Sequence, residues 1–203
     1  MAPLLNKFTA TRMKLFSYIL ILVAFTGDFN AQIFRSLPKT AFTAQFAGST
    51  GLYTFGVSKV SRYNKIELGL LYGRVPKSFG GINNSLVLKF TYNPFHIAVT
   101  EKIKFEPVQT GIFINQNFSK NRSLFWTDKY SKGYYWWTRS TRFHFFLSTQ
   151  VSLRIEKNHV DRLAWYFEAN TNDLYLYSYL PNPRSMSLYD IFFFGTGLKL
   201  YLD

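Results

Sequence analysis

The chain contains no cysteine, and this absence excludes several kinds of structure. It rules out a disulfide framework, a thiolate metal site and the lipid-modified cysteine of a lipoprotein anchor. Proline is sparse, with 7 residues in 203, and none lies in the interior of the strands predicted below. A closed ladder of strands requires this, because proline lacks the N–H group that the ladder uses.

Long hydrophobic runs are missing as well. No apolar stretch reaches the roughly 18 residues that a membrane-spanning helix needs. Aromatic residues nevertheless make up 20% of the chain, with 14 Tyr and 22 Phe, while the mean hydropathy stays close to zero. A soluble protein would have to expose many of these rings to water. A transmembrane β-barrel accounts for both facts, because apolar residues facing lipid alternate with polar residues facing the interior.

The N-terminal region has the organisation of a signal peptide. Arg12 and Lys14 form a basic region, and residues 15–25 form an apolar core that is too short to span a bilayer as a helix. Ala31 offers a small residue just before a cleavage point at Gln32. The sequence therefore predicts export.

The prediction of export divides the chain into two segments. Met13 is the more natural start, so the residues before it are interpreted as an upstream extension. We expect residues 1–31 to be a signal peptide and residues 32–203 to form one domain. The net charge of +13 then points to an anionic membrane surface, because export makes nucleic-acid binding remote.

Period-two alternation runs through the chain after the predicted cleavage point. The clearest example is 142–155, where the odd-numbered positions are mostly large and apolar, and the even-numbered positions include His144, Ser148 and Gln150. Alternation alone does not show which face lies inside. Export, together with the large apolar side chains on one face, favours a membrane barrel whose apolar face points outward.

Eight segments carry this alternation, and turn signals such as Asn93-Pro94 separate them. They predict an all-β fold, an eight-stranded antiparallel transmembrane β-barrel preceded by the signal peptide. The predicted strands are 41–48, 52–60, 65–73, 85–93, 107–118, 142–155, 162–170 and 191–203. With a periplasmic start, the outer loops are 49–51, 74–84, 119–141 and 171–190, and segment 94–106 is long for a periplasmic turn.

The last predicted strand carries a family resemblance. Its aromatic-rich alternation runs from Phe192 to Leu202 and closes the barrel at the C-terminus, which resembles small outer-membrane β-barrel proteins of Gram-negative bacteria. The leader ending Asn30-Ala31-Gln32 resembles those of the bacteroidete type. The chain departs from other branches by ending in Leu-Asp rather than in Phe. The resemblance implies the fold and an outer-membrane location, and it implies no activity.

The predicted barrel interior contains several charged residues. An eight-stranded barrel is just wide enough for side chains to fill. An isolated charge there is costly, so we expect the two glutamates to pair with several bases as a structural plug rather than an open pore. The residues predicted to form this network are Glu67, Lys89, Arg142, His144, Arg154, Glu168 and Lys199.

A catalytic site is a competing interpretation. Some small barrels of the outer membrane trim or transfer acyl chains of lipid A with a Ser and a His. The best candidates here, His144 and Ser148, lie about 13 Å apart along a strand, beyond hydrogen-bond reach. Phe146 occupies the position where the deacylase pattern has its serine. No catalytic residues are therefore predicted.

Segment 119–141 interleaves basic and aromatic residues. Such rings are typical of the girdle at a membrane interface, and the bases would lie level with lipid A phosphates. Trp, Tyr and Arg are also favoured anchors for a partner protein or polysaccharide, and Tyr175, Tyr177 and Tyr179 could extend that surface. The residues expected to face lipopolysaccharide or a partner are Lys129, Lys132, Trp136, Trp137 and Arg139.

The sequence contains no glycine-rich phosphate loop, no HExxH motif and no metal-ligand cluster, so no cofactor or metal is predicted. The leading hypothesis is a non-enzymatic outer-membrane barrel that acts as a structural or accessory subunit. Its expected partners are outer-membrane lipid, lipopolysaccharide and a larger outer-membrane protein complex, contacted through extracellular loops, and not nucleic acid. A lipid A acyl hydrolase or transferase and a narrow small-solute channel are the alternatives.

Overall fold

A computed structural model of the chain describes residues 37–79, 82–118, 140–157, 159–181, 183–185 and 187–202. The predicted signal peptide and most of segment 119–141 lie outside these residues. Every element below belongs to one compact unit that begins at Pro38. Among the described residues, no helix combines the length and the apolar character needed to cross a bilayer.

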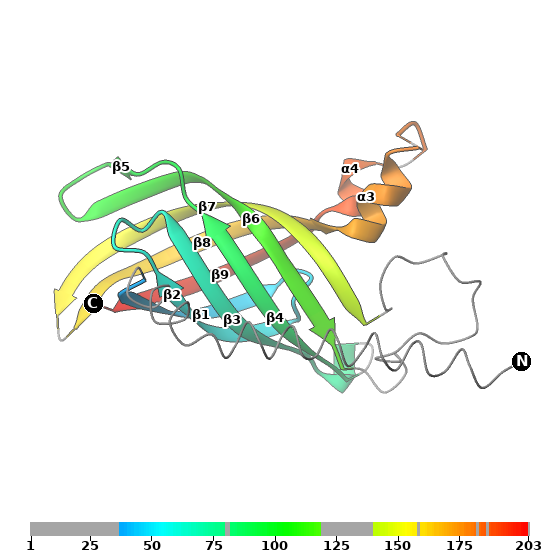
Figure 1. Ribbon diagram of the computed structural model, residues 1–203, viewed down its shortest axis with the longest axis horizontal. Coiled ribbons are helices and arrows are strands. Elements are labelled where there is room, and N and C mark those ends of the chain that lie inside the picture. Colours follow the sequence, from blue (N-terminus) through cyan, green and yellow to red (C-terminus); the bar gives the residue numbers. More distant parts are fainter. Residues whose placement is uncertain are drawn as a thin grey trace, which may run out of the picture. The chain divides into compact units, whose positions relative to one another are not determined.

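Eight long antiparallel strands form a closed barrel (Figure 1). They are β1 (Lys39–Ala47), β2 (Tyr53–Val60), β3 (Ile66–Val75), β4 (Asn83–Tyr92), β6 (Ile103–Asn117), β7 (Thr141–Lys157), β8 (Val160–Asn172) and β9 (Phe193–Leu202). Each strand pairs with the next, and β9 pairs with β1 to close the ring. The predicted eight-stranded antiparallel barrel is therefore confirmed.

The segment before β6 differs from its prediction. The predicted strand began at residue 107, but β6 begins at Ile103, and the short strand β5 (Ile97–Ala98) pairs with its first residues. Pro107 lies where the β6–β7 register shifts between Glu106 and Gln109. A proline is tolerated at such an irregularity, because the ladder loses no hydrogen bond there. Segment 94–106 is thus largely a hairpin and not one long turn.

The connection after β8 also differs from its prediction. It was predicted as an outer loop over 171–190, but it contains helices α3 (Asp173–Tyr179) and α4 (Leu188–Ile191). A third short helix, η1 (Lys77–Phe79), connects β3 to β4. We call the end with the β1–β2 turn, η1 and α3–α4 the helix end. The opposite end, where β1 begins and β9 ends, is the termini end.

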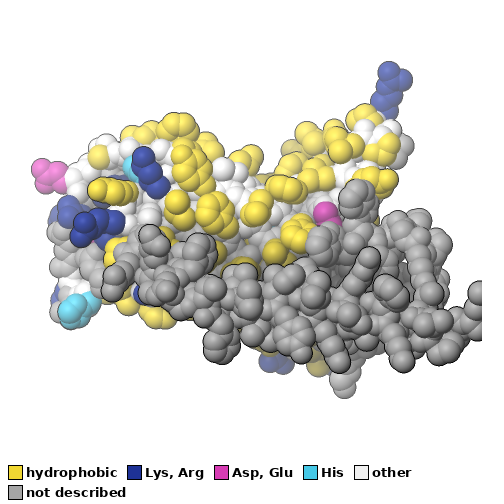
Figure 2. Space-filling model, in the orientation of Figure 1, with side chains coloured by type: hydrophobic (Ala, Val, Ile, Leu, Met, Phe, Trp, Pro, Cys, Tyr) yellow, Lys and Arg dark blue, Asp and Glu magenta, His cyan; other side chains and the backbone are white. Residues whose placement is uncertain are grey.

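The two faces of the barrel wall are inverted relative to a soluble barrel, as the alternation predicted. On β3, Leu68, Leu70 and Tyr72 are exposed, whereas Glu67 and Leu71 point inward and are buried. The same alternation continues on β4 and β7. Figure 2 shows hydrophobic side chains over the wall, and Lys and Arg side chains gathered toward the termini end.

Among the described residues, two small apolar clusters lie in the interior. The larger side chains of one are Leu71, Phe113 and Phe146, and Tyr201 lies in the other. Polar and charged side chains account for most of the other buried residues. This composition makes the lumen the place to look for a functional site.

Candidate functional site in the barrel interior

Two buried ion pairs cross the middle of the barrel. Lys89 on β4 pairs with Glu168 on β8, and the Lys199 ammonium on β9 lies 2.8 Å from Glu67 Oε2 on β3. Neither pair joins neighbouring strands, so each spans the lumen. These four residues belong to the predicted network, and the structure brings them together.

Aromatic rings surround the two ammonium groups. Lys89 Nζ lies 4.3 Å from the centroid of the Phe146 ring, and Lys199 Nζ lies 5.2 Å from that of Tyr166. The Tyr166 hydroxyl donates to Gln45 Oε1 at 2.8 Å. Cation–π contacts and the hydrogen bonds to the two carboxylates offset part of the cost of removing these charges from water. The pairs therefore connect strands that lie on opposite sides of the lumen.

A second cluster lies nearer the termini end and centres on Glu106. Its carboxylate accepts from Arg162 Nη1 at 3.3 Å and from Gln109 Nε2 at 3.1 Å, and Gln150 also donates to it. His96 Nδ1 lies 3.3 Å from the same carboxylate. Glu106 is fully buried, and this set of partners is what a buried carboxylate requires.

Sequence reasoning missed both charged members of this cluster. Glu106 was excluded because the predicted strand began one position later, at residue 107. Arg162 could have been found, because it shares the inward-facing even positions of β8 with Tyr166 and Glu168. Its guanidinium also stacks on Tyr201, 4.0 Å from the ring centroid.

The other predicted network residues lie apart from the two central pairs. Arg142 is half-buried and lies 3.6 Å from Asp173, so it connects β7 to α3 at the helix end. Arg154 occupies an inward-facing position of β7 but is exposed, because the strand is there close to its end. His144 is buried, and its ring stacks on Phe113 with centroids 4.4 Å apart.

The β1–β2 turn folds into the barrel mouth at the helix end. Asn115 Nδ2 donates to the Ser49 carbonyl at 2.9 Å, and Ser85 donates to the Thr50 carbonyl. Gly51 adopts a φ of +151°, which favours glycine. A Cβ on Gly73 would lie 1.9 Å from the Thr50 carbonyl oxygen, so only glycine lets the turn come this close. The turn is thereby held against β3, β4 and β6 at this end.

Ser49, and not Ser148, is the serine that contacts His144. Ser148 donates to Gln109 Oε1 at 3.1 Å, whereas Ser49 Oγ lies 3.1 Å from His144 Nδ1. The turn supplies Ser49 from another part of the chain. The spacing of residues along β7 therefore could not predict the contact between Ser49 and His144.

Hydrogen-bond directions decide what this serine and histidine can do. Asn170 Nδ2 donates to Glu168 Oε1 at 3.3 Å, so its carbonyl oxygen faces Ser49 and accepts the hydroxyl proton. With the hydroxyl proton directed at Asn170, the contact with His144 requires the tautomer that carries its proton on Nδ1. A general base would instead have to accept that hydroxyl proton. The contacts of Ser49 with His144 and Asn170 hold the β1–β2 turn in position.

The remaining predicted features concern metals and the outer surface. Within the described ranges, no group of three or more His, Asp and Glu side chains is placed to hold a metal ion. The predicted lipopolysaccharide and partner surface falls in 119–139, outside the described residues. The aromatic girdle over this segment stays a prediction.

Comparison with known proteins adds little beyond the fold. No protein-family model matches the chain, and no curated protein matches it in sequence. The chain is similar in structure to the N-terminal β-barrel domain of Pseudomonas aeruginosa OprF, with 11% identity and a TM-score of 0.41, over 81% of this chain and 96% of that one. A likeness this distant concerns the fold alone, and the closed barrel is established by its own strand pairings.

Proposed function

We propose that this chain is a small outer-membrane β-barrel without enzymatic activity, which acts as a structural or accessory subunit through its helix end. The observation that carries the proposal is the inverted wall. Phe55, Leu147 and Trp165 point outward and are exposed, while Glu106 and Glu168 are fully enclosed. Large apolar side chains that point outward would be unfavourable in water, but they are favourable where hydrocarbon surrounds the barrel.

The pairing of the backbone also suits a barrel that spans a membrane. A bilayer core offers no water to satisfy open N–H and C=O groups, so a spanning sheet must close on itself. Pairing of β1 with β9 removes both sheet edges. An exported barrel that spans a membrane is typical of an outer membrane, and the predicted signal peptide supports that location.

Cysteine labelling tests the membrane location directly, because the natural chain has no cysteine. Three single-cysteine variants place a thiol at different levels of β3 and its two connections. Tyr63→Cys lies at the termini end, Leu70→Cys on the wall and Phe79→Cys at the helix end. A membrane-impermeant maleimide should label Phe79→Cys on intact cells, Tyr63→Cys only after permeabilisation, and Leu70→Cys only after denaturation. Equal labelling of the wall and end positions would contradict the proposal.

The helix end is ordered and anchored to the barrel. The Asn172 side chain accepts from the Tyr175 N–H at 2.9 Å and begins α3, and Ser187 with Asp190 forms a capping box for α4. Tyr175 packs edge-on against Phe193 at a centroid distance of 5.3 Å. A rigid support of this kind lowers the entropy lost on binding.

Apolar side chains project from this support. Tyr177, Leu180 and Leu188 are exposed, and Tyr189 is 83% exposed. Large rings and leucines held in water on an ordered loop are typical of a protein-binding surface. The α3–α4 region is therefore the described part of the proposed partner surface, and the predicted surface in 119–141 stays a prediction.

Photo-crosslinking tests the accessory role. A photoreactive residue in place of Tyr189 should form one discrete adduct with a membrane protein in cells, whereas the same residue in place of Tyr63 should form no protein adduct. Tyr63 is the matched control, since it is 75% exposed at the opposite end. Absence of an adduct at both positions, in correctly inserted protein, would count against a partner at the helix end.

The absence of enzymatic activity has its own test. Mass spectrometry of lipid A from cells with and without the gene should give the same acyl composition. An acyl change that is lost in Ser49→Ala would overturn the non-enzymatic part of the proposal, because Ser49 is the serine in contact with His144.

One observation favours a narrow conduit as the second candidate. Polar side chains extend from Ser49 at the helix end to His96 at the termini end, through the central ion pairs. Bilayer recordings separate the two functions. A silent barrel supports the filled lumen, and steady single-channel steps would favour the conduit.

A further inference from the structure

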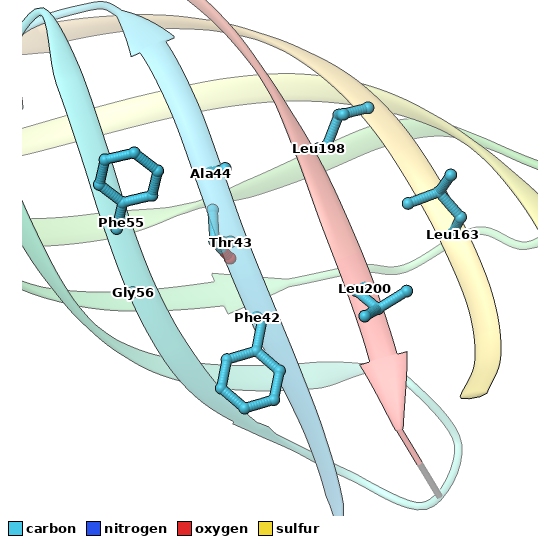
Figure 3. A pocket seen from close by; sticks show the side chains of 8 residues that line it. All are labelled: Phe42, Thr43, Ala44, Phe55, Gly56, Leu163, Leu198 and Leu200. Carbon is cyan, nitrogen blue, oxygen red and sulfur yellow. The ribbon is translucent and has the colours of Figure 1, made fainter. Parts of the chain in front are cut away.

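The outer wall of the barrel contains an apolar groove of about 290 Å³ (Figure 3). Ala44 on β1 lies directly between Phe55 on β2 and Leu198 on β9. A methyl group between larger side chains leaves a depression that the neighbouring strands do not fill. The outward side chains that line it are Phe42, Ala44, Phe55, Leu163, Leu198 and Leu200.

A cation lies at the termini end of this groove. Lys59 Nζ donates to Thr40 Oγ1 at 3.0 Å, and Thr40 precedes Phe42 on the outward face of β1. Within the residues that the structure describes, Lys59 has no carboxylate partner. Most other charges on the strands point inward and are paired, as in the Lys199–Glu67 pair. An outward lysine beside an apolar groove is therefore an exception in this barrel.

Two more bases extend this positive region. Arg62 and Lys65 lie on the β2–β3 turn that follows Lys59, and both are exposed. Neither has a carboxylate partner among the described residues. A phosphate group placed at this turn would meet three bases, which is favourable charge complementarity.

The dimensions fit one lipid. Thr40 and Ala44 are separated by about 13 Å along the strand, or about 10 Å in depth for a strand tilted by about 40°. Half of a bilayer's hydrocarbon core measures about 15 Å. An acyl chain whose head group sits at Lys59 therefore reaches the groove over Ala44.

We infer that this groove binds one anionic phospholipid, with its phosphate at Lys59, Arg62 and Lys65 and an acyl chain over Ala44. The inference rests on the proposed function, because only a membrane-spanning barrel meets such a lipid at this face. The site lies in the leaflet at the termini end. It is distinct from the partner surface at the helix end.

Native mass spectrometry of the full chain in mild detergent tests the site. The protein is equilibrated with phosphatidylglycerol or with zwitterionic phosphatidylethanolamine, and the retained lipids are counted. We expect one retained phosphatidylglycerol and little phosphatidylethanolamine. Ala44→Phe should fill the groove and abolish retention.

A triple variant tests the head-group part separately. Lys59→Gln, Arg62→Gln and Lys65→Gln together should reduce the preference for phosphatidylglycerol by roughly a hundredfold, because each base near an anionic lipid contributes about fivefold. These side chains are at least partly exposed, so the barrel should fold even if Ala44→Phe does not. Folding of each variant is checked by the faster gel mobility of an unheated barrel.

Ala169→Phe is the matched control for the groove. Ala169 is another small outward residue, on β8 between Leu147 and Phe194 on the adjacent strands, and it does not line the groove. This variant should retain the lipid. Equal retention of both lipids by the natural chain, or unchanged retention in folded Ala44→Phe, would overturn the inference.

Two further outcomes are informative. A dimer that is lost in Ala44→Phe would assign the groove to a second copy of this chain and overturn the lipid site. Protection of Leu70→Cys in the labelling experiment without any retained lipid would reject the lipid site alone. Free labelling of Leu70→Cys would reject the membrane barrel itself.

Discussion

The two faces of β7 show how one strand serves two environments. Leu147 points outward and is exposed, and under the proposed function it meets hydrocarbon, where its contacts need no particular geometry. Ser148, the next residue, points inward and donates to Gln109 at 3.1 Å. The lumen thus depends on specific polar partners, whereas the wall depends only on being apolar. The two faces should therefore respond very differently to substitution.

Breaking a central ion pair should have the largest effect. Glu168→Ala leaves the buried Lys89 ammonium without its carboxylate, and we expect a loss of about 3–5 kcal/mol in the free energy of unfolding. Urea or guanidinium titration of the barrel in lipid vesicles measures this loss. The double variant Lys89→Leu with Glu168→Leu should recover much of it, because no charge is then left unpaired. If the free energy of unfolding does not recover, the ion pair contributes more to stability than the neutralisation of each charge by the other.

Placing a charge on the wall should have the next largest effect. Leu70→Arg puts a guanidinium at an outward position of β3, and we expect a loss of about 2–4 kcal/mol in vesicles. In the same vesicles, Leu70→Ala should cost clearly less, because it keeps the wall apolar. A small effect of Leu70→Arg would contradict the assignment of this face to hydrocarbon.

Loosening the turn in the barrel mouth should have a smaller effect. A Cβ at Gly73 meets the Thr50 carbonyl, so Gly73→Ala should displace the β1–β2 turn at a cost of roughly 1–3 kcal/mol. The displaced turn should also free Ser49 from His144. Nuclear magnetic resonance of the His144 ring, whose stacking on Phe113 is independent of the turn, reports that change. An unaltered His144 signal would show that the turn does not depend on this glycine.

The smallest effect is expected at the helix end. Asn172→Ala removes the side chain that begins α3, which should cost about 1 kcal/mol in local stability. Because α3 lies outside the strand ladder, amide hydrogen exchange should rise in 173–179 and remain unchanged in β3. A global loss of stability would mean that the helices support the barrel.

Strand number and facing were predictable, because period-two alternation depends on near neighbours in the sequence. On β9, for example, Leu198 and Lys199 lie on opposite faces, and the predicted export indicates that the leucine faces outward. Strand ends were less predictable. Pro107 indicated a strand start, yet β6 continues through a register shift back to Ile103. Only pairing with β7 makes that continuation favourable.

The site was predictable in part. Glu67, Lys89, Glu168 and Lys199 follow from alternation, since a buried charge needs a partner. Which glutamate meets which lysine was not predictable, because the pairs cross the lumen between non-neighbouring strands. The contact of Ser49 with His144 was equally hidden, since a turn brings in a residue from far along the chain.

Local alternation in the sequence specifies the all-β architecture and which side chains share a face, because the side-chain period of a strand depends on near neighbours. The pairing of charges across the lumen, the position of the β1–β2 turn and the groove on the wall depend on tertiary structure. Those features depend on residues that lie far apart in sequence and meet only when β9 pairs with β1 and closes the ring.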